Sequence, residues 1–68
     1  MIVMDVGKNI RKSRRQRNVT QVQLANELKI SRTTLSSYEN DRRIPNILTV
    51  WMIADVLDIC IDELVGRR

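Results

Sequence analysis

The chain has 68 residues, of which 12 are lysine or arginine and 8 are aspartate or glutamate, giving a net charge of +4 at neutral pH. A chain this short is expected to form a single domain, residues 1–68, around one small core. It has no histidine and one cysteine, Cys60. This composition excludes histidine bases, histidine-ligated metals, cysteine-rich zinc sites and an internal disulfide, and it fits a reducing cytoplasm. No apolar run approaches the roughly 20 residues that cross a bilayer. We therefore expect neither an enzyme nor a membrane protein, and no metal, cofactor or small-molecule ligand.

Charged and apolar residues are distributed unequally along the chain. Residues 1–43 carry ten basic and four acidic side chains, a net +6, whereas residues 44–68 carry two basic and four acidic ones, a net −2. Apolar residues are densest between Ile44 and Val65. Residues 1–43 are thus expected to bind a polyanion, and residues 44–68 to pack through apolar side chains.

The spacing of apolar residues is helical nearly throughout, which predicts an all-α bundle of five short helices. The first helix is expected to start after an Asp5 cap and to end near residue 17, before a left-handed turn at Asn18. A capping box between Thr20 and Gln23 predicts the start of the second helix, and Ser31 is expected to cap the third. The residues predicted to face inward from these three helices are Val6, Ile10, Ser13 or Arg14, Leu24, Ala25, Leu28, Leu35 and Tyr38.

Pro45 cannot lie inside a helix, so residues 41–45 are predicted to form a loop. Asn46 is expected to cap a fourth helix over residues 47–57, followed by a short fifth helix that Asp62 and Glu63 open. Trp51, like Tyr38, is expected to pack in the interior, because a single-stranded nucleic acid binder would need a row of aromatics. The core face of the fourth helix is predicted to be Ile47, Val50, Ile53, Ala54 and Leu57.

Residues 21–40 describe two short helices joined by a tight turn, a helix-turn-helix. The segment from Thr20 to Asn40 resembles the Cro/phage-repressor (Xre-like) family of bacterial DNA-binding regulators, because it follows the pattern TQ-x-x-LA-x-x-x-x-(V/I)S-x-x-x-(I/L)S-x-(Y/W)E. The match continues through Arg43 and Pro45 to Leu64. The resemblance implies a lambda-repressor-like domain that binds double-stranded DNA through its third helix, in the major groove.

The chain departs from this family at helix ends, where glycine is usual. It has Asn18, Lys29, Asp41 and Asp58 at these positions, and Cys60 where serine often caps the last helix. Asn and Asp tolerate the left-handed conformation, but Lys29 is expected to carry about 1 kcal/mol of strain. None of these departures affects a residue expected to face DNA.

The third helix is expected to read base edges, since arginine pairs with guanine and the threonine methyl group contacts that of thymine. The residues predicted to do so are Arg32, Thr33, Thr34, Ser36 and Ser37; the alternative is a solvated helix face. Phosphate contacts are expected where helix N-termini present free amides, and in the loop after the third helix. The predicted contacts are Thr20, Gln21 (the family's phosphate contact), Arg14, Asn40, Arg42 and Arg43. Arg14 and Glu39 also occupy positions that often form an ion pair in this family; the alternative is two separate surface charges.

The fourth helix carries a second apolar stripe, Leu48, Met52 and Val56, which a small monomer cannot cover. A second subunit is expected to cover it, while the alternative is the N-terminal segment of residues 2–4. The predicted dimer interface is Leu48, Trp51, Met52, Val56, Cys60 and Ile61. Residues 47–65 would thus serve packing and dimerisation. The acids Asp55, Asp58, Asp62 and Glu63 are interpreted as surface charges rather than a cation site.

These features predict a dimeric transcriptional repressor on a two-fold symmetric operator. Phage repressors, restriction-modification controllers and antitoxin-like autoregulators share this architecture. The alternative function is a protein-interaction module, antitoxin-like or an adaptor, that binds a partner protein through the apolar face of the fourth helix. Steep salt dependence of duplex binding would distinguish the regulator from this module.

Overall fold

The computed structural model of the chain describes residues 5–65, and within that range it contains helices and no strand. The helices are α1 (Val6–Gln16), α2 (Gln21–Leu28), α3 (Arg32–Glu39), α4 (Ile47–Leu57) and α5 (Ile61–Val65). The predicted all-α fold is confirmed. None of the helices described has the length and apolar character that a membrane crossing requires.

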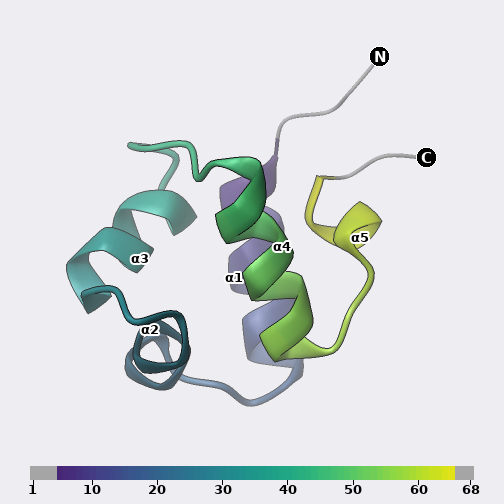
Figure 1. The fold of residues 1–68 in the computed structure, drawn as a ribbon, viewed down its shortest axis with the longest axis horizontal. Helices are drawn as coiled ribbons and strands as arrows, with labels where there is room; N and C mark the ends of the chain where they lie inside the picture. Colours follow the sequence, from purple (N-terminus) through teal and green to yellow (C-terminus); the bar gives the residue numbers. More distant parts are fainter. Residues whose placement is uncertain (1–4, 66–68) are drawn as a thin grey trace.

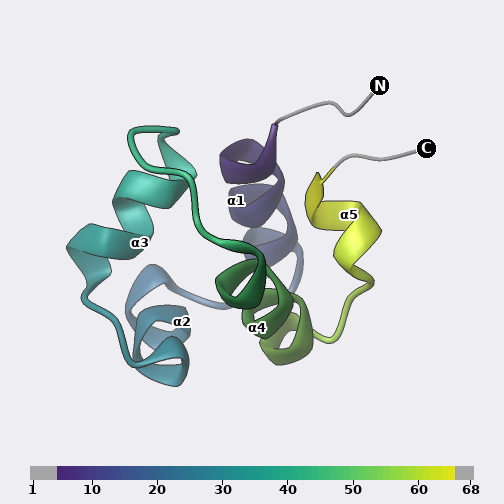
Figure 2. The same cartoon turned by 45° about the horizontal axis from the view of Figure 1, so that its top comes forward.

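Two central helices support the others. In Figure 1, α4 lies in front of α1, with α2 and α3 on one side of this pair and α5 on the other. The turned view keeps the same order (Figure 2). Helix α1 packs against α3, α4 and α5, while α2 packs against α3 and α4. The α2–α3 pair therefore packs on one side against α1 and α4, and its other side faces solvent.

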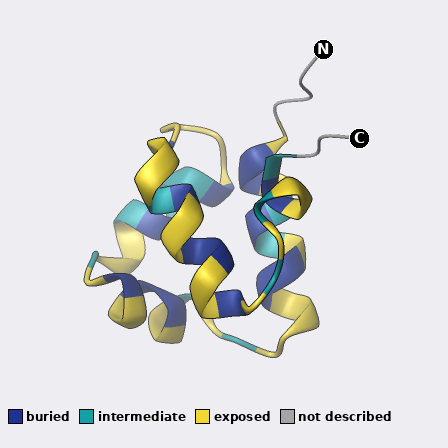
Figure 3. Ribbon diagram, turned by 45° about the vertical axis from the view of Figure 1, so that its right-hand side comes forward, coloured by how far each residue is buried: buried dark blue, intermediate teal, exposed yellow. Residues whose placement is uncertain are grey.

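The core receives apolar side chains from every helix, and the buried faces turn inward in Figure 3. Ile47 and Trp51, both expected inside, are instead 67% and 65% exposed. They lie one turn apart at the edge of the buried face of α4, so both predictions are wrong for the same reason. Tyr38 is half-buried against the core, as expected. The largest fully buried side chains are Ile10, Leu24, Leu35, Ile53, Leu57 and Leu64.

Helix boundaries follow the predicted local signals with one exception. The residues expected in the left-handed conformation all have positive φ, between 56° and 59°: Asn18, Lys29, Asp41 and Asp58. Asn46 caps α4 through a 2.8 Å bond from the Thr49 amide to its side-chain oxygen. Asp5 precedes α1 but makes no side-chain capping bond. Its backbone, at φ −97° and ψ 40°, lacks the extended conformation of the other caps, so the predicted Asp5 capping bond is wrong.

Gly7 lies where α1 packs tightly against the end of α3. A Cβ atom there would collide with the Tyr38 carbonyl oxygen and lie 3.0 Å from that of Glu39. Because backbone cannot move aside as a flexible side chain can, only glycine lets the two helices approach this closely.

Gly7→Ala is expected to lower the free energy of unfolding by about 1–3 kcal/mol, the usual cost of overpacking. The same change in an open helix would stabilise it by about 1 kcal/mol. The sign of the change in unfolding free energy therefore distinguishes a tight contact from an open position. Thermal unfolding followed by circular dichroism measures the effect, with Gln16→Ala, at an exposed position of α1, as the control. An unchanged or higher midpoint for Gly7→Ala would contradict the tight approach.

Candidate nucleic-acid interface

Local hydrogen bonds fix the geometry of the α2–turn–α3 segment. The Thr20 hydroxyl accepts from the Gln23 amide at 3.1 Å, and the Gln23 side-chain oxygen accepts from the Thr20 amide at 2.9 Å. Lys29 ends α2 in the left-handed conformation, with φ 58°. Ser31 then caps α3 by accepting from the Thr34 amide at 3.1 Å. The predicted capping box, left-handed turn at Lys29 and serine cap are all confirmed.

The outer side of α3 carries short polar side chains around one arginine. Arg32 and Thr33 are exposed, while Thr34, Ser36 and Ser37 are partly buried. The Ser37 hydroxyl donates to the Thr33 carbonyl oxygen at 3.1 Å. The five predicted base-reading residues therefore share one helix, and the two that open it extend furthest into solvent.

Glu39 forms the buried polar junction between α1, α2 and α3. Its carboxylate accepts from Arg14 Nε at 2.7 Å and Nη2 at 3.1 Å, and from Gln21 Nε2 at 3.1 Å. Arg11 Nε lies 3.5 Å from the same carboxylate. The Glu39 side chain has no solvent exposure, and the expected ion pair with Arg14 is confirmed. These four residues are called the Glu39 cluster.

Arg14 differs from the other predicted phosphate contacts. Its side chain is 10% exposed, and its third nitrogen, Nη1, donates to the Val19 carbonyl oxygen at 2.9 Å. All three guanidinium nitrogens thus have acceptors within the protein. Arg14 therefore supports Glu39. One N–H on each of Nη1 and Nη2 remains available, so its phosphate contact stays a prediction.

Two opposing effects act on the pKa of Glu39. Burial alone would raise the pKa, because it penalises the charged carboxylate. The hydrogen bonds from Arg14 and Gln21, with the positive charges of Arg14 and Arg11, outweigh burial and hold the pKa below its ordinary value. The carboxylate is therefore ionised at neutral pH, and its ion pairs persist there.

Gln21 connects the Glu39 cluster to the start of α3. Because its amide nitrogen donates to Glu39, its oxygen faces Arg32 and accepts from Nη1 at 3.3 Å. A predicted phosphate contact and a predicted base reader are thus joined by a hydrogen bond. The sequence did not reveal this pairing of residues 21 and 32, which depends on how α2 and α3 pack.

The bonds that Arg11 makes to the end of α3 were not predicted from the sequence, which indicated only that part of the basic run at residues 11–17 would lie near DNA. Its Nη2 donates to the Asn40 side-chain oxygen and to the Glu39 carbonyl oxygen. Asn40 in turn donates to the Ser36 hydroxyl at 3.2 Å, so its side-chain amide has a fixed orientation. The only signal in the sequence was the position of Arg11 three residues before Arg14, on the same side of α1.

The loop after α3 holds two exposed arginines. The amides of Arg42 and Arg43 both donate to the Ser37 carbonyl oxygen, at 2.9 and 3.3 Å. The Arg43 guanidinium lies over the Tyr38 ring, 6.0 Å from its centre. The backbone of this loop is therefore anchored to α3, and both charges remain in solvent.

The second apolar stripe predicted on α4, called the ridge from here on, is exposed. Leu48, Met52 and Val56 are 65%, 43% and 36% exposed, with Trp51 beside them. Cys60 is also exposed, and Ile61 is partly buried against the core. Residues 2–4, the alternative cover for the ridge, lie outside the described residues.

Comparisons by sequence identify relatives among transcription factors. The helix-turn-helix family model matches residues 10–64. An immunity repressor protein of Bacillus phage phi105 is 40% identical over 65 residues, 96% of this chain and 45% of that protein. The transcriptional repressor RstR of the cryptic phage CTXphi of Vibrio cholerae is 39% identical over 64 residues, 94% of this chain and 57% of that protein. The chain thus spans about half the length of these relatives.

Comparisons by structure agree with this fold. The P22 c2 repressor, solved with a synthetic operator, superposes with a TM-score of 0.83 at 21% identity, covering 97% of this chain and all of that one. The controller protein C.AhdI of a restriction-modification system from Aeromonas hydrophila has a TM-score of 0.82 at 24% identity, covering 90% and 92%. At these identities the likeness establishes the fold alone.

The lowered pKa of Glu39 predicts acid sensitivity. Above the ordinary value of 4.5 the ionised carboxylate contributes its full stabilisation, and this is lost as the pH falls through the lower pKa of the folded state. The free energy of unfolding should therefore decrease with falling pH, and less steeply in Glu39→Gln. Urea unfolding across the acid range measures both slopes, with the exposed Glu27→Gln as control. The carbon-13 shift of the Glu39 carboxyl in the wild type reports its pKa directly, and a value at or above 4.5 would contradict the geometry.

Proposed function

The chain belongs to the helix-turn-helix family, in its Cro/phage-repressor (Xre-like) group, and from this premise we propose that it regulates transcription by binding double-stranded DNA. It acts as a dimeric repressor that occupies a two-fold symmetric operator in the cytoplasm. The observation that carries the proposal is the exposed polar face of α3, held by the Glu39 cluster and flanked by the exposed arginines at residues 42 and 43. Its role is recognition, not catalysis.

Helix α3 enters the major groove with its first turn leading. Arg32 donates to guanine O6 and N7, and Thr33 offers a methyl group to thymine. Thr34, Ser36 and Ser37 follow along the same side of the helix. Gln21 orients Arg32 toward the groove through their hydrogen bond, which limits the side-chain entropy lost when the base is bound.

The DNA backbone passes the starts of α2 and α3 and the loop that follows α3. The free amides at the start of α2 and α3 attract phosphate, and Thr20 and Gln21 lie at the first of these. Asn40, Arg42 and Arg43 contact phosphate at the other end. The anchored backbone of the 40–43 loop supports this role, because phosphate contacts set the position of the recognition helix.

Two copies pair through the apolar ridge of α4. Trp51, Cys60 and Ile61 border the ridge Leu48, Met52 and Val56, and burial is favourable by roughly 25 cal/mol per Å² of apolar surface. The longest dimension of the domain is 32 Å, close to the ~34 Å that separates half-sites one DNA turn apart. Two adjoining copies have the size needed to reach both half-sites. The same ridge favours the second candidate function, a module that binds another protein.

Arg32→Ala and Arg43→Ala are expected to weaken DNA binding in different ways. Arg32→Ala should cost about 1–3 kcal/mol and relax base preference at one position in each half-site. Arg43→Ala should weaken all duplexes alike and reduce the salt slope by about one per subunit. Selection from random duplexes followed by salt titrations separates the two effects. Equal losses on every sequence for Arg32→Ala would make it a phosphate contact, and an unchanged slope for Arg43→Ala would make it a solvated loop residue.

Met52→Glu is expected to yield a folded monomer, because pairing would bury an uncompensated charge. Sedimentation at micromolar concentration measures the change, and the monomer should bind DNA weakly and without two-fold footprints. Asn26→Glu introduces the same charge at an exposed position of α2 and serves as the control. A wild type that is monomeric both free and on DNA, or a Met52→Glu variant that remains dimeric, would contradict this interface. If Met52→Glu remains dimeric, residues 2–4 become the better candidate for covering the apolar face of α4.

A further inference from the structure

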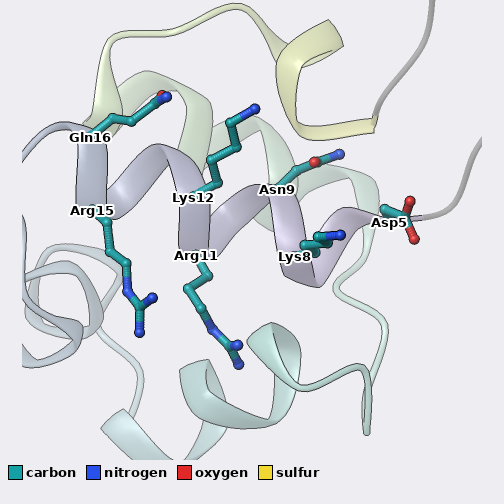
Figure 4. A pocket seen from close by; sticks show the side chains of 7 residues that line it. All are labelled: Asp5, Lys8, Asn9, Arg11, Lys12, Arg15 and Gln16. Carbon is teal, nitrogen blue, oxygen red and sulfur yellow. The ribbon is translucent and has the colours of Figure 1, made fainter.

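The outer surface of α1 is hollowed and lined mainly by cations (Figure 4). Lys8 and Arg15 each lie three or four residues from both Arg11 and Lys12, so like charges are neighbours on the helix surface. In the described part of the chain only Arg11 among them has an acidic partner, Glu39. This arrangement is self-repelling, and an anion at the surface would relieve the repulsion.

The hollow has two flanks with different neighbours. In Figure 4, Arg11 and Arg15 extend toward α2 and α3, whereas Lys12 and Asn9 lie on the side of α5. Asn9 Nδ2 donates to the Leu64 carbonyl oxygen at 3.0 Å, which ties that flank to α5. Arg11 bonds Asn40, which ties the other flank to the end of α3. One flank therefore adjoins the candidate interface, and the other does not.

We propose that Arg15, beside Arg11, extends the phosphate-contacting surface onto α1, so that the protein holds the DNA backbone outside the groove occupied by α3. The inference rests on the proposed function and adds a contact to it. Arg11 is already bonded to Asn40 and Glu39. Arg15 is exposed, and within residues 5–65 its side chain makes no hydrogen bond or ion pair.

The neighbours of Arg15 along the chain support this role. It directly follows Arg14, which bonds the Val19 carbonyl oxygen just before the phosphate-attracting start of α2. A cation here can approach a phosphate that the α2 amides also attract. The guanidinium group suits the task, because its planar set of donors matches two phosphate oxygens at once.

Arg15→Gln and Lys12→Gln provide a matched test on the full chain. Each removes one positive charge from an exposed position of α1, on opposite flanks of the hollow. Arg15→Gln should lower the slope of log affinity against log salt by about 0.9 per subunit, the value for one phosphate contact. Lys12→Gln should leave the slope unchanged, and Arg15→Lys should restore it. Circular dichroism verifies that all three variants are folded.

An equal fall in slope for Arg15→Gln and Lys12→Gln would overturn the inference, because it would indicate a general electrostatic effect. An unchanged slope for Arg15→Gln would also overturn it and leave Arg15 as a solvated charge near the helix end. Either result leaves the proposed function intact, provided that the wild type binds duplex DNA with a steep salt slope. A wild type with no such binding would instead overturn the proposed function itself.

Discussion

The ion-paired carboxylate of Glu39 is the contact on which the arrangement of α1, α2 and α3 depends. A buried charge is costly unless it is paired and fully hydrogen-bonded, and removing one partner of such a pair costs about 3–5 kcal/mol. Arg14 and Gln21 provide those bonds here. For a domain of this size that cost is comparable to the whole stability, on the order of 5 kcal/mol. The recognition helix is thus supported by a directional polar junction as well as by apolar contact.

The same junction extends to the outer surface. Since Glu39 accepts from the Gln21 nitrogen, the Gln21 oxygen must face α3, where it holds Arg32. At the other end of α3, Arg11 holds Asn40. Both ends of the exposed helix are therefore oriented by side chains that also contact the buried carboxylate. A change at Glu39 would disturb residues that solvent or a ligand can reach.

Helix α4 meets a different constraint. A small domain has little interior, and four residues of α4 occupy it, namely Val50, Ile53, Ala54 and Leu57. The remaining apolar residues of the helix are left in solvent. Exposed apolar surface on α4 and exposed cations around α1 and α3 thus lie on different elements, so the proposed DNA contact and the proposed pairing of two copies use different surfaces.

Sequence alone determined the features that depend on near neighbours. The capping residues Thr20, Ser31 and Asn46, the left-handed positions and the break at Pro45 all act within a few residues, so the helix boundaries could be predicted. The Arg14–Glu39 pair was expected only through the family resemblance. The tertiary structure decided the Arg14–Val19, Gln21–Arg32 and Arg11–Asn40 bonds, and the exposure of Ile47 and Trp51. The physical reason is that helical periodicity identifies the apolar side of a helix, but not where its contact with the neighbouring helices ends. Which residues lie beyond that contact, and which distant side chains meet, depends on how the helices rotate and cross when they pack.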